Sequence, residues 1–239
     1  MRSVLWLAAG AVLLASSLGS GCAYRLIPGP LAPLPKGEQA EQATVADDGT
    51  VTLHIDRFRV SLKPVSDDEL NRQYPARSRA GKHSVNPYTF GNWIPEGTSR
   101  TPKKFTVFLL VVENYSYPKA LLDPLDMTIH AANGRVFESH GLPFLKEYYY
   151  PYNRAYAGNA HADFRDRIDL LARTMYPTDE MVFSGQVVQG YVVFPKLHDD
   201  VHDIVVHVPD VALRFDYRGE PSETAALAFH FQRDVGRAQ

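Results

Sequence analysis

The chain has 239 residues and a formal net charge of −2 at pH 7, from 25 Lys and Arg against 27 Asp and Glu. This balance lacks the basic excess of a nucleic-acid-binding surface, so we expect no nucleic-acid partner. The length leaves room for one large or two small domains, and the 45% of apolar residues suits a globular core. Because 17 Pro and 16 Gly separate short apolar runs, β structure is expected rather than helix.

The first segment has the order of a leader that ends in the only cysteine of the chain. Arg2 precedes the apolar stretch 4–15, and small residues lead from there to Cys22. This order resembles a bacterial lipoprotein signal, in which the cysteine thiol accepts diacylglycerol after a small residue. A plain cleaved signal peptide over residues 1–21 and a membrane-spanning anchor are the alternatives. The apolar core is, however, shorter than the roughly 20 residues that a spanning helix needs.

Lipidation would make Cys22 the first residue of the mature chain and its membrane anchor. Each buried CH₂ group contributes about 0.8 kcal/mol of membrane affinity, so several acyl chains give permanent attachment. The resemblance implies a bacterial cell envelope location, and Ala23, which stands where an Asp would retain the protein at the inner membrane, implies the outer membrane. No cysteine then remains for a disulfide, and the domain depends on its core.

Residues 22–48 are expected to form a flexible tether. Four prolines lie between residues 28 and 35, and few bulky apolar residues follow Leu34. Pro-rich segments extend by roughly 3 Å per residue, so the tether would hold the folded part some tens of ångströms from the membrane.

Residues 49–239 are predicted to form one β domain with two insertions. The alternation of residues 51–62 slips by one position, which predicts a bulge or bend within a long first strand. Residues 64–104 lack periodicity and form the first insertion, which we expect to be functional or partly disordered. A strand over residues 105–115 is apolar on both faces, as in the centre of a sandwich. Asn133-Gly134 then predicts a tight hairpin with two positive φ angles.

The second insertion covers residues 143–180, where the β pattern breaks. Apolar side chains at helical spacing predict a short helix over residues 162–175. Strands resume over residues 182–183, 186–194, 203–208, 211–217 and 225–232. Roughly seven or eight short strands separated by turns are typical of a Greek-key β-sandwich.

Three segments of this pattern carry a resemblance to a known kind of domain. They are Phe105–Ser116, which ends in Glu-Asn-Tyr-Ser, Asn133–Phe137, and the strand Gly185–Pro195 with glycines at 185 and 190. Together they resemble the immunoglobulin-like domains common in bacterial lipoproteins of uncharacterised function. The resemblance spans residues 50–235 apart from the second insertion, and implies an all-β, immunoglobulin-like sandwich without implying a function.

Two clusters could form sites. His198, Asp200 and His202 lie in the segment His198–Asp203, and a turn could bring them together as ligands of a divalent metal. The alternative is a solvated turn between two strands, which we favour, so no metal and no cofactor is expected.

The second cluster is aromatic and belongs to the second insertion. Its members are Tyr148, Tyr149, Tyr150, Tyr152 and Tyr156. Tyrosine combines an apolar ring with a polar tip, as protein interfaces and carbohydrate platforms require. The cluster forms either a partner surface or the packing of the insertion on its own sandwich.

No nucleophile, metalloprotease or phosphate-loop motif accompanies these clusters, so we expect no enzyme. The expected function is that of a lipid-anchored module that binds or scaffolds another envelope component, with an envelope protein as the expected partner. A metal-dependent enzyme or metal carrier, and a glycan- or lipid-binding lipoprotein, are the alternatives.

Overall fold

In the computed structural model, which describes residues 25–155 and 159–238, the alternation of residues 51–62 builds a hairpin. Its strands are β4 (Val51–Ile55) and β5 (Phe58–Val65). Ile55 pairs with Phe58, and Asp56 between them has a φ of 53°. Two-residue hairpin turns need positive φ, which Asp tolerates better than most residues. The predicted bulge or bend in one long strand is therefore wrong, because the slip marks a turn.

Five antiparallel strands of the described residues form the first sheet, in the order β11-β6-β5-β4-β3. Its other strands are β3 (Ala43–Val45), β6 (Phe105–Asn114) and β11 (Gln186–Pro195). The predicted strand over residues 105–115 is confirmed as β6. β11 pairs with it along its full length on one side, and β5 pairs with its residues 107–114 on the other.

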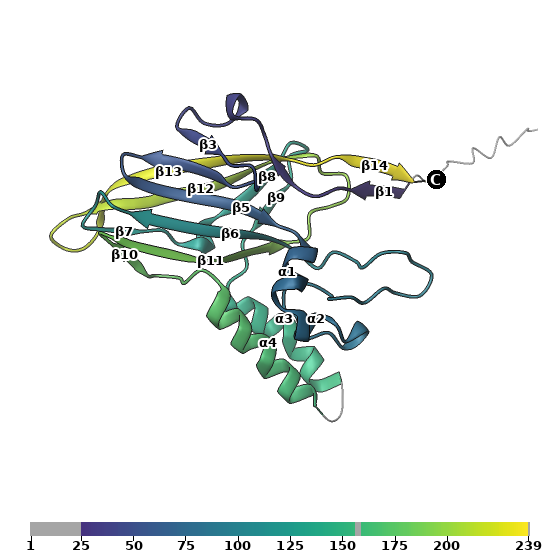
Figure 1. Ribbon diagram of the computed structural model, residues 1–239. Helices are drawn as coiled ribbons and strands as arrows, with labels where there is room; N and C mark the ends of the chain where they lie inside the picture. Colours follow the sequence, from purple (N-terminus) through teal and green to yellow (C-terminus); the bar gives the residue numbers. More distant parts are fainter. Residues whose placement is uncertain (1–24, 156–158, 239) are drawn as a thin grey trace, which may run out of the picture.

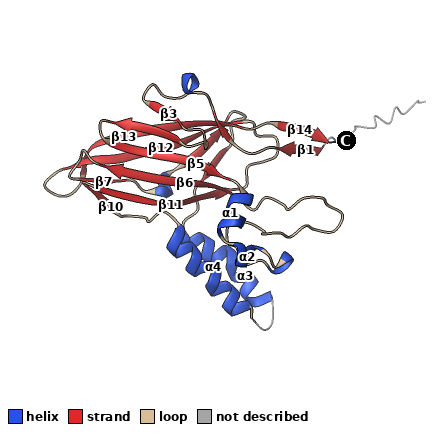
Figure 2. Ribbon diagram, viewed as in Figure 1, coloured by secondary structure: helices blue, strands red, loops and turns tan. Residues whose placement is uncertain are grey.

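A second sheet of seven described strands lies against the first (Figures 1 and 2). Its strands are β2 (Ala32–Pro33), β7 (Lys119–Leu121), β8 (Thr128–Ala131), β9 (Val136–Glu138), β10 (Met181–Phe183), β12 (Asp203–Phe215) and β13 (Pro221–Gln232). β12 joins two strands that we expected to be separate. Its register shifts between Val208 and Val211, and Asp210 has a φ of 52°. This bulge lets β12 pair with β8 before it and with β7 after it.

The main apolar core fills the space between the two sheets. Phe108 and Leu110 of β6 pack there with Phe229 and Phe231 of β13, and all four are fully buried. Each such side chain contributes about 1.5–3 kcal/mol through burial. The prediction of a mostly-β chain with packed sheets is confirmed.

The hairpin at Asn133-Gly134 is also present, but its turn differs from the expected one. His130 pairs with Val136, and the Ala131 and Arg135 backbones are hydrogen-bonded across a three-residue loop. Only Gly134 of this loop has a positive φ, at 84°. This is a three-residue hairpin loop that ends in a left-handed glycine, so the dipeptide marks the turn without forming a two-residue one.

Residues 25–45 contain three short strands that pair with the rest of the domain, which corrects the flexible tether expected over residues 22–48. β1 (Arg25–Pro28) pairs with β14 (Val235–Ala238), β2 pairs with β13, and β3 pairs with β4. The Gln39 side chain donates to the His230 carbonyl and accepts from the His230 N–H, at 2.6 and 3.0 Å. Prolines are tolerated here because β1 and β2 lie at sheet edges, where a missing N–H leaves no partner unbonded.

Two helical segments cover the outer face of the first sheet at one end (Figure 1). α3 (Leu142–Ala155) and α4 (Ala160–Thr174) form one, and α1 (Asp67–Gln73) and α2 (Pro75–Ser78) belong to the other. A second apolar cluster lies beneath them, with Val107 and Val193 from the sheet and Leu145 and Leu171 from the helices. The helix predicted over residues 162–175 is confirmed as α4, whereas α3 was not predicted. No helix within the described ranges is long and apolar enough to cross a membrane.

Polar side chains give residues 64–104 an ordered structure without apolar periodicity. Asn86, fully buried, donates to the Ser78 hydroxyl at 2.9 Å and accepts from the Tyr88 N–H at 2.9 Å. The side-chain amide oxygen Oδ1 of Asn71 accepts from the Thr89 hydroxyl at 2.6 Å. Such a network satisfies backbone groups that helix or sheet would otherwise pair, and period-based patterns cannot show it.

Candidate functional site

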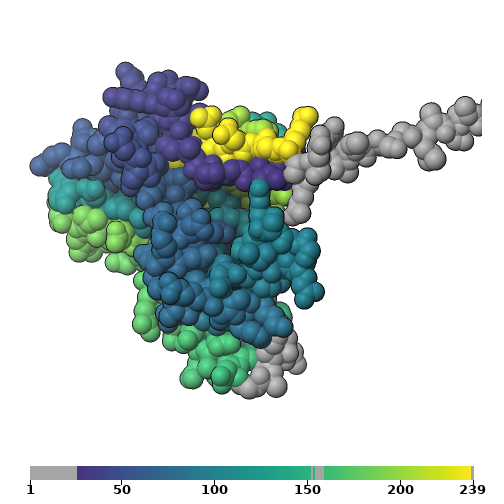
Figure 3. Space-filling view, turned by 45° about the vertical axis from the view of Figure 1, so that its right-hand side comes forward, coloured from purple at the N-terminus to yellow at the C-terminus, as the bar shows by residue number. Residues whose placement is uncertain are grey.

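A cleft of about 780 Å³ lies at the end of the sandwich where β1 meets β14. Figure 3 shows this end, with β1 in purple beside β14 in yellow and the first insertion below them in blue and teal. Three parts of the chain line the cleft: residues 26–31, residues 95–103 of the first insertion, and the ends of the sandwich strands. Two of these three parts belong to segments that we expected to be a tether and an insertion that is functional or partly disordered.

The walls of the cleft combine apolar and charged side chains. The apolar ones are Leu26, Ile27, Leu31, Val65, Val107 and Leu197, together with prolines of the N-terminal segment and of the 95–102 loop. Mixed walls of this kind are typical of ligand sites, in which apolar surface gives affinity and a few polar groups give orientation.

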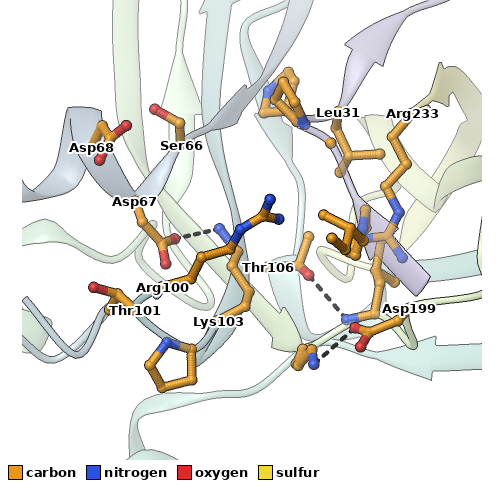
Figure 4. A pocket seen from close by; sticks show the side chains of 18 of the residues that line it. Leu31, Ser66, Asp67, Asp68, Arg100, Thr101, Lys103, Thr106, Asp199 and Arg233 are labelled. Atoms are coloured by element: carbon orange, nitrogen blue, oxygen red, sulfur yellow. Dashed lines mark hydrogen bonds and ion pairs between the residues drawn. The ribbon is translucent and has the colours of Figure 1, made fainter. Parts of the chain in front are cut away.

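Two ion pairs neutralise most of the charge in the cleft (Figure 4). Lys103 bonds Asp67, and Lys196 lies 2.8 Å from Asp199. Asp67 begins α1 after the Ser66 N-cap, whose hydroxyl accepts from the Glu69 N–H at 3.1 Å. Burial raises the pKa of Asp67 above its ordinary value, and the charge of Lys103 opposes that rise. The ion pair with Lys103 therefore holds the Asp67 carboxylate in a partly buried part of the cleft wall.

Arg100 differs from the other cations that line the cleft. Within the described part of the chain, its guanidinium has no ion pair and no hydrogen bond. Figure 4 shows Arg100 pointing into the space between Asp67 and Asp199. A guanidinium has five donors in a planar fork that matches carboxylate or phosphate oxygens, and those of Arg100 are available to a ligand.

Arg233 is a second cation in the wall, and backbone carbonyls hold it. Its Nε donates to the Val201 carbonyl at 2.7 Å, and its Nη2 donates to the His198 carbonyl. Burial lowers the pKa of Arg233, while Asp199 and Asp200 act in the opposite direction. These bonds fix the position of the charge without neutralising it, because carbonyls carry no formal charge.

The tyrosines of the predicted partner surface occupy different environments. Tyr149 is 1% exposed, and its hydroxyl donates to the Pro87 carbonyl. Tyr148 is half-buried and packs on Phe105 at 5.2 Å, whereas Tyr150 is 53% exposed. Tyr149 therefore follows the second alternative, packing of the insertion on its own sandwich, because α3 turns that side chain onto the sheet. Tyr152 lies in α3, and Tyr156 and Cys22 lie outside the described residues.

Sequence reasoning missed the buried cation beneath Tyr149. The Lys104 Nζ lies 3.2 Å from the Asn86 carbonyl oxygen and 4.6 Å from the centre of the Phe90 ring. Burial and, to a lesser extent, the charge of Arg167 lower the pKa of Lys104 to about 7. The only signal in the sequence is the pair of lysines that precedes β6. Because neighbouring residues of an extended chain face opposite ways, Lys103 points toward the cleft and Lys104 lies beneath the helices.

The structure does not bring His198, Asp200 and His202 together. Asp200 pairs instead with Arg135, whose Nη1 lies 2.6 and 2.8 Å from the two carboxylate oxygens. In the described ranges, no group of three or more His, Cys, Asp or Glu side chains is placed to hold a metal ion. His198 packs on Phe137, with ring centres 5.9 Å apart.

Comparison with known proteins gives no relative. No family model, no curated protein and no solved structure matches the chain.

Proposed function

We propose that the chain is a lipid-anchored envelope protein that binds another envelope component, without catalysis, in the cleft at the end of the sandwich. The observation that carries this proposal is the position of the cleft relative to Cys22. β1 lines the cleft and begins three residues after that cysteine. At no more than about 3.6 Å per residue, an acylated Cys22 would lie within roughly 11 Å of the start of β1.

The pairing of β1 with β14 supports a short attachment. Because residues 25–28 are held by four paired positions, the domain would stand close to the membrane surface. The cleft would then face the headgroup region, and a ligand in it would be an envelope component near that surface. Ala23 after the cysteine supports attachment to the outer membrane.

An immunoglobulin-like, Greek-key arrangement is part of the same proposal. Two packed antiparallel sheets support it, as do the structural roles of its motif residues. Asn114 ties the end of β6 to β10 by donating to the Val182 carbonyl at 2.8 Å. Gly190 lets Tyr176 pack directly on β11.

Acyl labelling tests the anchor. The full-length chain, tagged at its C-terminus, is produced in its native membrane with a palmitate analogue. We expect the wild type to carry the label and Cys22→Ser to carry none. A wild type without label would contradict the anchor.

A cleft-filling variant tests the binding site. Thr101→Trp places an indole in the cleft, and Thr224→Trp, on exposed β13, is the matched control. Proteins and lipids that co-purify in mild detergent are identified by mass spectrometry. We expect at least one component to fall strongly with Thr101→Trp and to stay at the wild-type amount with Thr224→Trp. No difference between the two variants would contradict the cleft as the binding site.

A further inference from the structure

We infer that the cleft binds the phosphate-bearing head group of a phospholipid from the membrane that holds Cys22. This inference rests on the proposed function and names the ligand class for its cleft. It is carried by three features of the described residues: the charge left unpaired in the cleft, its apolar wall, and the position of that wall next to the anchor.

The charge that remains after internal pairing is positive. Lys103 and Lys196 are paired with Asp67 and Asp199, which leaves Arg100 and Arg233 against Asp68. Asp68 lies in the first turn of α1, where the helix dipole stabilises a negative charge without a partner. The chain as a whole has a formal charge of −2, so the cleft departs from the rest of the molecule in sign. A group with a negative charge complements it.

The hydrogen-bond donors of Arg100 and Arg233 suit a phosphate group better than they suit a small apolar or neutral ligand. Arg100 offers a free guanidinium fork, and arginine bonds phosphate through two parallel N–H donors. Arg233 is held in the wall by the carbonyls of Val201 and His198, so its charge is pre-positioned. A ligand that brought no charge would leave the net positive charge of the cleft uncompensated.

The apolar wall distinguishes a lipid from a free anion. Leu26, Ile27 and Leu31 line the cleft on the segment that leads from Cys22. An inorganic anion would gain nothing from these side chains, whereas the glycerol backbone and upper acyl chains of a phospholipid would bury against them. The acyl chains on Cys22 would hold the cleft at the depth where such lipids are found.

Native mass spectrometry of the full-length chain in mild detergent tests this inference. The probes are phosphatidylglycerol, diacylglycerol with the same acyl chains, and inorganic phosphate. Arg100→Gln removes the free charge and keeps the length, and Arg79→Gln is the matched control, since Arg79 is exposed and outside the cleft. Equal melting temperatures of the two variants establish that both are folded.

The wild type and Arg79→Gln should bind phosphatidylglycerol about tenfold more tightly than Arg100→Gln, which corresponds to ~1.4 kcal/mol. Diacylglycerol lacks the phosphate group. Its binding to the wild type should therefore be no tighter than the binding of phosphatidylglycerol to Arg100→Gln. Equal phosphatidylglycerol binding by the two variants would overturn the inference. So would phosphate binding as tight as that of the lipid, which would indicate a small-anion site. Because the protein is purified, these results do not depend on whether Cys22 directs it to the envelope.

Discussion

At the scale of single residues, Asn114 shows how one polar side chain can stabilise a β fold. It is fully buried, and its amide nitrogen donates to the carbonyls of Tyr117 and Val182 at 2.9 and 2.8 Å. Its oxygen accepts from the Tyr117 N–H at 2.9 Å. One side chain therefore satisfies the backbone where β6 ends and joins that end to β10. The Glu-Asn-Tyr-Ser motif is structural at this position.

Replacing Asn114 should destabilise the fold strongly. Asn114→Ala leaves buried backbone groups without partners, so we expect the free energy of unfolding to fall by about 3 kcal/mol. Asn114→Asp keeps the acceptor but removes both donor bonds, and should be no more stable than Asn114→Ala. Urea denaturation measures both changes. Asn133→Ala, at an exposed turn, should cost about 0.5 kcal/mol or less. An Asn114→Ala variant as stable as this control would contradict the structural role.

Lys104 should make stability depend on pH. Its pKa in the folded chain is about 7, below the ordinary 10.5. Between these values the unfolded chain binds a proton that the folded chain does not, so stability rises with pH from about 7 to 10. Lys104→Met should abolish that rise and, by removing a buried charge, add about 1–3 kcal/mol to the free energy of unfolding at pH 6.

Denaturation at pH 6, 8 and 10 measures this effect as the difference between wild type and Lys104→Met. The difference should shrink as pH rises, because Lys104 becomes neutral. Lys146→Met, at an exposed position of α3, should follow the wild-type pH profile. A difference between wild type and Lys104→Met that stays constant over the three pH values would contradict the buried-cation assignment.

At the scale of elements, the contact between α4 and β11 depends on a glycine. A Cβ at position 190 would lie 2.3 Å from the Tyr176 backbone nitrogen. Tyr176 follows α4, and its N–H donates to the Tyr191 carbonyl at 3.0 Å. The close approach of these two backbones therefore requires the absence of a side chain.

Gly190→Ala should cost about 2–4 kcal/mol, since the added methyl group displaces a backbone segment and breaks its hydrogen bond. Urea denaturation measures the loss, and hydrogen exchange should place it in α4 and the residues that follow. Gly37→Ala is the control, because its Cβ would meet nothing within 4 Å. Equal stability of the two variants would show that the Tyr176 backbone moves aside without cost.

The elements that the sequence predicted are those whose apolar side chains repeat with a single period. Residues 105–115 became β6 and residues 162–175 became α4, because burial of a repeating face determines both. Residues 25–45 were misjudged, since short edge strands rich in proline pair through few backbone groups and have no apolar alternation. The order of residues 64–104 could not be predicted because polar side chains, notably Asn71 and Asn86, replace periodic packing.

The site was harder to predict than the elements, for a physical reason. The cleft combines three segments that lie far apart in the sequence, and Arg100 is notable only because no neighbour among the described residues pairs with it. A sequence shows charges but not which of them are paired in space. The tyrosine cluster was easy to see in the sequence, yet Tyr149 is buried because α3 is amphipathic and aligns it with Leu145.

At the scale of the whole molecule, both ends of the described chain meet at the end of the sandwich that holds the cleft. Gly29 donates to the Asp234 carbonyl at 2.7 Å, just beyond the paired strands β1 and β14 (Figure 1). β13 runs toward this end through 12 residues, which is roughly 40 Å at about 3.3 Å per residue, so its first residues lie at the far end of the sandwich. A lipid on Cys22 would therefore bring one end of the molecule to the membrane and hold the other away from it.

Fluorescence quenching from the membrane distinguishes this arrangement from a flexible tether. Cys22 is the only cysteine, and lipidation would consume its thiol, so Ser99→Cys and Ser222→Cys would each give a single labelling site in the lipidated chain. Ser99 lines the cleft, and Ser222 is exposed near the start of β13. With a quencher on the phospholipid, the label at position 99 should be quenched strongly and the label at position 222 should keep its unquenched intensity. Similar quenching of both labels would mean that the pairing of β1 with β14 opens at the membrane, and that the domain moves freely on residues 22–48.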